Sequence, residues 1–399
     1  MTSLERAVLA DFYRDQLLDN TLPFWFPRCI DDDHGGFLHC LDRDGTVIDT
    51  DKSVWAQGRM AWLLATLHAT VEPRPEWLAW SRSGIDFLRQ HGFDSDGQML
   101  FQVTREGRPL RKRRYVFSEA FFAIALAAYA RAAGDEEAAT EARAVFASFR
   151  RFVETQGLLP PKVDPATRPA KSLAIPMITM GVAQTFRDAL GDEPEWTSLI
   201  NRCIEEIRND FVDPQRHCVF ETVGPAGEFL DHFDGRLLNP GHAIEAAWFI
   251  LHEARVRGGS ADLTSLGTQI LDWMWQRGWD PEHGGILSFV DVSGLPTQEY
   301  WHDMKFWWPH NEAIIATLLA WRLTGDSRYA GMHRDVHTWA HDHFADGECG
   351  EWFGYLHRDG SVSSRLKGNL WKSAFHLPRM QWYCWRLLAD ASEHDSESV

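Results

Sequence analysis

The sequence predicts an all-α fold, an (α/α)6 barrel of six inner and six outer helices with short β-hairpins at one mouth. The first observation is a turn-rich segment that recurs, with starts at residues 31, 93, 211, 279 and 344. Each copy has an acid-rich turn, a short alternating strand and a second turn that usually contains glycine, which is typical of a β-hairpin. The starts lie 62, 118, 68 and 65 residues apart, so the doubled gap predicts a sixth unit without a recognisable hairpin, at 155–173.

The second observation is that two kinds of helical stretch alternate between the hairpins. Amphipathic stretches precede the hairpins and strongly apolar stretches follow them, which places the apolar helices inside and the amphipathic helices outside. The third observation is that no glycine- or serine-rich linker interrupts the period, so we expect one domain over residues 1–399. The clearest apolar stretches are 55–69, 119–132, 241–254 and 311–323, and the clearest amphipathic ones are 75–90 and 261–276.

Charge and hydropathy exclude several classes of protein. Lys and Arg total 40 against 57 Asp and Glu, and the formal charge of −17 argues against a nucleic-acid partner. The first residues lack the basic flank and apolar core of a secretory signal, and the longest apolar run, 120–130, is too short to span a bilayer. We therefore expect a soluble, cytoplasmic protein without a membrane partner.

Cysteine and tryptophan usage narrows the chemistry further. The six cysteines show no CxxC pair and no metal-ligand spacing, which predicts reduced thiols and no metal site. The chain has 19 tryptophans, and flat aromatic faces are surfaces on which sugar rings stack, although most of them are expected to fill the core.

Polar residues gather in the first turns of the predicted inner helices. Because every inner helix follows its hairpin, these first turns meet at one mouth of the barrel. A lone histidine or glutamate near a helix start is more often structural. Here the repeat places several such residues at equivalent depth around one cavity, which favours function: Arg59, His242, Glu245, Glu312, His376 and Arg379. The helix start that supplies Glu312 also supplies Trp308 and His310 at the mouth.

Five stretches resemble the N-acylglucosamine 2-epimerase family, which also includes cellobiose 2-epimerases and aldose-ketose isomerases. They are "DKSVWAQGRMAW", "NPGHAIEAAWF", "KFWWPHNEA", "GEWFGYLHRDG" and "FHLPR", in order along nearly the whole chain. The resemblance implies an enzyme that interconverts N-acetylglucosamine and N-acetylmannosamine without a metal or a cofactor needed for chemistry. It also implies a homodimer and ATP as an activator that is not consumed.

The resemblance assigns roles to nine residues. The histidines on either side of carbon 2 would be His242 of "PGH" and His376 of "FHLPR". The third unit reads "SLAIPMITM" where cellobiose 2-epimerases have a further histidine, which favours the acylamino-sugar branch. The substrate-binding residues implied are Arg59, Lys171, Glu245, Trp308, Glu312, Trp371 and Arg379.

The reaction itself requires such residues. Epimerisation at carbon 2 of an open-chain aldose removes a proton next to the carbonyl and returns one to the opposite face, so two bases are needed. An imidazole, whose ordinary pKa is about 6.5, both accepts and donates a proton at neutral pH. The enolate oxygen requires a positive or donating group, which Arg59 or Arg379 can supply.

Three alternatives stay open at this point. An (α/α)6 glycoside hydrolase would use two of the carboxylates Glu119, Glu245 and Glu312. An epimerase or isomerase could act on mannose, glucose or cellobiose, and a binding role would need no catalysis. The basic stretch 105–115 is either a solvated turn or, by our hypothesis, a holder of nucleotide phosphates.

Overall fold

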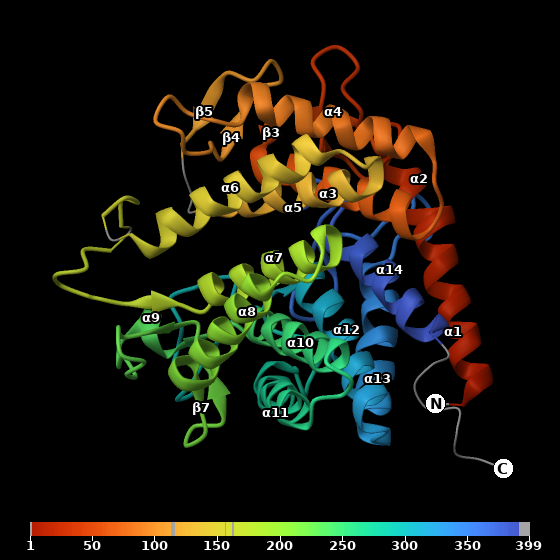
Figure 1. Ribbon diagram of the computed structural model, residues 1–399. Helices are drawn as coiled ribbons and strands as arrows, with labels where there is room; N and C mark the ends of the chain where they lie inside the picture. Colours follow the sequence, from red (N-terminus) through yellow and green to blue (C-terminus); the bar gives the residue numbers. More distant parts are fainter. Residues whose placement is uncertain (1, 113–115, 156, 162, 391–399) are drawn as a thin grey trace.

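A computed structural model describes residues 2–112, 116–155, 157–161 and 163–390. Within them, the element order and the contacts between helices give an inner and an outer ring of long helices, as the sequence predicts. Figure 1 shows these helices. The inner ring contains α3 (Val54–Thr70), α5 (Phe117–Ala133), α7 (Ala174–Leu190), α10 (Pro240–Val256), α12 (Trp307–Thr324) and α14 (His376–Ala389). The outer ring contains α1 (Ser3–Asp15), α4 (Pro75–His91), α6 (Glu136–Glu154), α8 (Pro194–Glu206), α11 (Ala261–Gly278) and α13 (Ser327–Phe344).

The burial of each ring follows its sequence pattern. Every residue of α5 from Ser118 to Ala130 is buried, because this helix is covered on all sides. The outer helix α6 instead buries a single stripe that includes Ala138, Ala142 and Phe149, and its charged residues face water. Asp135 caps the N-terminus of α6 by accepting a hydrogen bond from the backbone of Ala138.

The first and last long helices of the chain pack together and complete the rings. Helix α1 packs against α14, so the first outer helix covers the last inner one (Figure 1). The indole of Trp382 on α14 donates to the hydroxyl of Thr70 on α3 at 3.0 Å. The last inner helix is thereby joined to the first.

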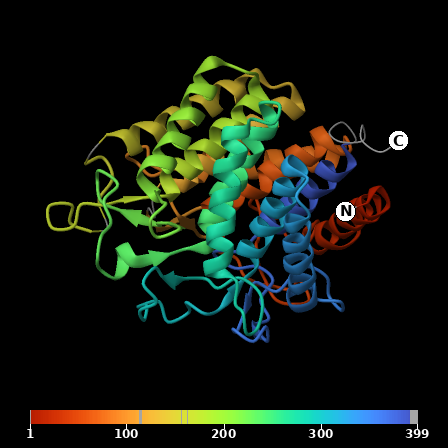
Figure 2. The same cartoon turned by 90° about the horizontal axis from the view of Figure 1, so that it is seen from below.

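Short antiparallel strands follow the outer helices and precede the inner ones. In Figure 2 the green and teal strands lie along one side of the helical body. The pairs are β1 (Cys40–Leu41) with β2 (Val47–Asp49), β3 (Lys52–Ser53) with β4 (Gln102–Val103) and β4 with β5 (Pro109–Arg111), β6 (Lys171–Ser172) with β9 (Thr222–Val223), β7 (Val212–Asp213) with β8 (Cys218–Val219), β10 (Leu237–Leu238) with β11 (Val290–Asp291), and β12 (Lys305–Phe306) with β13 (Tyr355–Leu356) and β13 with β14 (Val362–Ser364). Short helical segments complete the structure: Gln16–Thr21, α2 (Leu22–Trp25), Ile207–Phe211 and α9 (Phe233–Arg236).

The hairpins do not all pair within themselves. Strand β11 pairs with β10 from the preceding unit, and β3, β6 and β12 each pair with a strand of the next hairpin. In the segment 155–173, the described residues contribute a single strand, β6, which agrees with the expected absence of a sixth hairpin.

Buried lysines tie neighbouring hairpins together. Each lysine Nζ binds an aspartate of its own unit and backbone carbonyl oxygens, and an arginine from the next hairpin binds the same aspartate. In the third case the arginine comes from the first hairpin and the aspartate from the last, so this set joins the two ends of the hairpin series. The three sets are Lys52 with Asp31 and Arg105, Lys305 with Asp280 and Arg358, and Lys367 with Asp346 and Arg43.

No helix within the described ranges combines the length and the hydrophobicity needed to cross a membrane. That one domain spans the whole chain stays a prediction.

Candidate active site

The first turns of α10, α12 and α14 bring the two candidate histidines together. Helix α10 begins "NPGH": Asn239 caps it by accepting from the His242 backbone N–H at 3.2 Å, and Pro240 occupies the first helical position. A Cβ on Gly241 would lie 2.6 Å from the Trp308 ring, so only glycine allows this close approach. This local sequence therefore fixes both His242 and the indole beside it.

Trp308 contacts both imidazoles. Its ring centroid is 5.1 Å from that of His242 and 6.1 Å from that of His376. The two histidines come from α10 and α14, on either side of α12, and both contact the same aromatic group. Both predicted histidines therefore lie beside the same side chain, Trp308.

His242 is held by a carboxylate that the sequence analysis did not single out. Its Nδ1 lies 2.9 Å from Oε2 of Glu221, in the loop that leads into β9. Burial lowers the pKa of His242, but the negative charges of Glu221, Glu245 and Glu312 outweigh burial and leave that pKa above its ordinary value. His242 consequently keeps its proton to a higher pH than an ordinary imidazole does.

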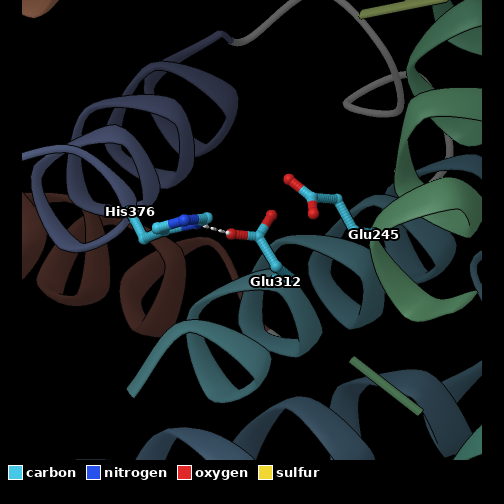
Figure 3. Close-up of side chains that lie close together, drawn as sticks. All are labelled: Glu245, Glu312 and His376. Carbon is cyan, nitrogen blue, oxygen red and sulfur yellow. Dashed lines mark hydrogen bonds and ion pairs between the residues drawn. The ribbon is translucent and has the colours of Figure 1, made fainter. Parts of the chain in front are cut away.

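His376 is held in a different electrostatic setting (Figure 3). Its Nδ1 donates to Oε1 of Glu312 at 2.7 Å, and Nη2 of Arg379 donates to the same oxygen at 2.6 Å. Burial first, and then the positive charges of Arg379 and Arg59, bring the pKa of His376 well below its ordinary value. His376 is therefore neutral at physiological pH and can accept a proton.

Both reacting nitrogens follow from these contacts. Because Nδ1 of each ring donates to a carboxylate, Nε2 is the atom left to exchange a proton with a substrate. Glu312 is fully enclosed, and its other oxygen accepts from the indole N–H of Trp248 at 2.6 Å. That carboxylate is saturated with donors and orients His376.

Arg59 faces the same site from α3. Its guanidinium lies over three aromatic rings, with the carbon Cζ 4.7 Å from the Trp55 centroid, 4.1 Å from that of Phe121 and 4.8 Å from that of Phe375. Burial lowers the pKa of Arg59, although Glu245 acts in the opposite direction. Among the described residues, Nε of Arg59 is a buried donor without a hydrogen-bond partner in the protein.

The cluster of Glu245, Glu312 and His376 is not arranged to bind a metal ion. Ligand atoms of Glu245, Glu312 and His376 lie within 4.8 Å of one another, which is close enough for a cation. However, Nη2 of Arg379 lies 2.9 Å from Glu245, 2.6 Å from Glu312 and 3.3 Å from His376. The guanidinium already provides the positive charge at this point.

Lys171 and Trp371 lie apart from this group. Lys171 forms ion pairs with Asp210 and Glu206, next to the outer helix α8. Trp371 is 37% exposed and packs beside Trp55, at 5.7 Å between centroids. Trp371 therefore borders the mouth next to Arg59, whereas Lys171 is engaged by acids.

Two residues predicted at the mouth instead accept hydrogen bonds from the hairpin backbone. His310 is fully buried and its Nε2 accepts from the backbone N–H of Ile286 at 2.9 Å, while burial lowers its pKa to about 3. Glu119 is also buried and accepts from the backbone N–H of Met99 at 2.8 Å. The expectation that both face the catalytic cavity was wrong, because a hairpin backbone needs a partner on the inner helix.

Cations of the basic stretch 105–115 are paired with acids. Arg105 binds Asp31, and Lys112 binds Asp94. The hypothesis of a phosphate site also included residues 113–115, which lie outside the described part of the chain. The ion pairs favour the interpretation of a charged surface turn.

A cavity of about 860 Å³ occupies the barrel lumen toward the C-terminal ends of the inner helices. Its walls include Trp62, Trp248 and Trp382, and Arg379 and Phe375 line it as well. Arg379 thus borders both this lumen and the group around His376.

Sequence reasoning missed Glu221 and Trp248. Glu221 lies in "CVFETVGPAG", which reads as a turn, and a single acid in a turn carries no periodic signal. Trp248 lies on the apolar helix α10, where an indole is expected to fill the core. Only the fold shows that each contacts a site residue.

The fold and the two imidazoles fit a sugar epimerase, and sequence comparison shows that class of enzyme. The chain belongs to the N-acylglucosamine 2-epimerase family, whose sequence profile matches residues 36–377. It is 37% identical to the N-acylglucosamine 2-epimerase of Bos taurus over 93% of this chain and 89% of that protein. It is 35% identical to the Homo sapiens protein of that name, over 94% and 88%.

Solved structures share the fold. Cellobiose 2-epimerase from Bacillus thermoamylovorans superposes with a TM-score of 0.81 at 20% identity, over 96% of this chain and 99% of that one. A D-mannose isomerase also gives 0.81, at 18% identity, over 94% and 97%. A family 76 glycoside hydrolase gives 0.61 at 12% identity, over 97% and 78%. The (α/α)6 barrel predicted from the repeat is confirmed.

Proposed function

We propose that the protein interconverts N-acetyl-D-glucosamine and N-acetyl-D-mannosamine, with His242 and His376 exchanging the proton at carbon 2. The proposal rests on one observation. Both imidazoles contact the indole of Trp308, and their surroundings raise the pKa of His242 and lower that of His376. Paired titratable groups whose pKa values are driven apart are the usual sign of an acid and a base.

The reaction starts from the open-chain aldose. Nε2 of the neutral His376 removes the carbon 2 proton, and the electron pair moves into the carbon 1–carbon 2 bond, leaving negative charge on oxygen 1. His242, protonated at Nε2, returns a proton to the opposite face of carbon 2, and the carbonyl forms again. The sugar leaves as its epimer, with the extra proton now on His376.

Arg59 is the group best suited to stabilise the charge on oxygen 1. Glu245 and Glu312 both bind Arg379, whereas the guanidinium of Arg59 is surrounded by aromatic rings that exclude water. A fixed positive charge in such a setting stabilises an oxyanion more than it would in water. Arg379 adds a second positive charge to the site, since its Nη2 binds Glu245 and Glu312.

Glycoside hydrolysis is less well supported. An inverting or retaining hydrolase needs one protonated carboxylic acid as a donor. Glu312 already accepts from Arg379, His376 and Trp248, and Glu245 accepts from Arg379, so both are held as acceptors. Assays on N-acetylmannosamine, mannose, glucose and cellobiose would decide between acylamino and unsubstituted sugars.

Isotope exchange tests the proposed chemistry. The protein is incubated with N-acetylmannosamine or N-acetylglucosamine in deuterated water, and carbon 2 is followed by NMR. We expect deuterium at carbon 2 of the epimerised product. Conversion without incorporation, or release of a glycoside leaving group instead, would contradict the mechanism.

Single histidine variants sharpen this test. His242→Gln and His376→Gln should each lower epimerisation by about 10²- to 10⁴-fold, since each removes one acid–base group. Each variant should still exchange the carbon 2 proton of one epimer, a different epimer in the two cases. Exchange of both epimers by one variant would show that a single base serves both faces.

ATP activation and a homodimer stay predictions that rest on the family relationship, and a cytoplasmic location stays a prediction from the sequence pattern. We propose ATP as an activator outside the chemical step, and assays with and without ATP would test it. The oligomeric state would be measured by light scattering.

A further inference from the structure

Each candidate histidine contacts one carboxylate, but the two carboxylates differ in what else they bind. Glu312 is shared between His376 and Arg379, so its charge is compensated by a guanidinium 2.6 Å away. Among the residues that the structure describes, Glu221 forms no ion pair with a lysine or arginine. The charge of Glu221 therefore acts on His242 alone.

Glu221 is placed by the strand pairing. Its backbone oxygen accepts from the N–H of Leu173 at 3.0 Å, next to the β6–β9 pair. Lys171, which lies two residues from Leu173, binds Asp210 and Glu206 and leaves Glu221 without a cation. The Glu221 side chain is 18% exposed, so its interaction with His242 is only weakly screened by solvent.

We propose that Glu221 is a positioning residue that holds the proton on His242, so that His242 is the acid and His376 the base of the resting enzyme. This inference rests on the proposed function of the two histidines. Other charged groups facing His242 are Glu245 on α10 and Glu312 on α12, both shared with Arg379 on α14, and the neutral but titratable His376 lies near it as well. Among the described residues, Glu221 is the one carboxylate with a hydrogen bond to the His242 ring.

The expected effect has a definite sign. The active form carries one proton on the pair, on His242, so kcat/KM falls at high pH when His242 loses it. With Glu221 neutralised, burial is the dominant influence and lowers the pKa of His242. The high-pH limb of the profile should then move to lower pH, and each unit of that shift costs about tenfold in kcat/KM at a pH above both values.

The experiment compares Glu221→Gln, Glu221→Asp and Glu228→Gln with the unmodified protein. The glutamine variant keeps the shape without the charge, and the aspartate variant keeps the charge. Glu228, an exposed carboxylate in the same loop region, is the matched control. The pH profile of kcat/KM is measured in both directions, and thermal unfolding checks that all variants are folded.

We expect Glu221→Gln to shift the high-pH limb downward while Glu221→Asp and Glu228→Gln keep it in place. A uniform loss of activity at every pH, or the same profile for Glu221→Gln and the unmodified protein, would overturn the proposal. The variant His242→Gln separates the two ideas: if it retains full activity, the proposed function fails, and if it is inactive while Glu221→Gln has an unshifted profile, only the role of Glu221 fails.

Discussion

Glu312 connects three groups of the site at the scale of single residues. It receives hydrogen bonds from His376, Arg379 and Trp248 and is fully enclosed. Glu312→Gln removes the charge that holds the base in place, so we expect kcat to fall by about 10²-fold or more. It also leaves Arg379 with one partner, and loss of one member of a buried pair costs about 3–5 kcal/mol.

Steady-state kinetics and urea unfolding would check both effects. Glu348→Gln is the control, because Glu348 forms an ion pair with Arg43 but is 78% exposed. It should change neither activity nor stability measurably. If Glu312→Gln behaved like this control, Glu312 would not orient the base.

Gly241 allows a second prediction at this scale. An alanine Cβ there would overlap the Trp308 ring at 2.6 Å, so Gly241→Ala must displace the indole that contacts both imidazoles. We expect a loss of kcat/KM of at least tenfold, because a shift of about 1 Å costs up to about 10²-fold. The control is Gly331→Ala on α13, where the nearest atom would be 4.0 Å away and alanine should leave activity unchanged. Equal activity of the two variants would contradict the assignment of Trp308.

At the scale of elements, three histidines recur every fourth residue along α13. They are His333, His337 and His341, and burial lowers their pKa values to about 4, about 2 and about 4. Tyr13 on α1 bonds to Nδ1 of His337 at 2.8 Å, and Phe12 packs edge-on against His341. The contact between these two outer helices thus depends on neutral imidazoles.

Acid should weaken this contact. An unfolded histidine has a pKa of about 6.5, so the unfolded chain binds more protons than the folded one between about pH 6.5 and 4. Stability is fully present above this window and falls within it by up to about 1.4 kcal/mol per pH unit for each histidine. His341→Phe should reduce that slope by about one proton between pH 6 and 5 in urea unfolding, whereas His357→Gln on an exposed turn should not. Identical slopes would show that His341 is not neutral in the fold.

The helices could be predicted from sequence, whereas the strand pairing could not. Periodicity separates α5, apolar all round, from α6, apolar along one stripe. Pairing of β10 with β11 depends on where neighbouring units meet, which no local pattern records. His242 and His376 could be proposed because each lies in a local motif at a helix start. The contact of His242 with Glu221 could not, because no local pattern records it and only the fold shows it.

At the scale of the whole molecule, Arg43 connects the first hairpin of the chain to the last one. It binds Asp346 at 2.7 Å, and Asp346 is 2% exposed whereas Arg43 is 39% exposed. Arg43→Met leaves Asp346 with Lys367 as its one cation among the described residues, so we expect a lower midpoint in urea unfolding than for the unmodified protein. Arg365→Met, which removes a pair at the 73% exposed Arg365, should cost less. Equal midpoints in urea unfolding would contradict a role for Arg43 in ring closure.

Ring closure also governs when the chain can finish folding during synthesis. Tyr13 finds its partner His337 only 324 residues later, and Trp25 donates to Glu351 across 326 residues. The apolar stripe of α1 therefore stays uncovered until almost all of the chain has emerged from the ribosome. Such an early, uncovered helix is a ready target for chaperones and a point at which aggregation can begin.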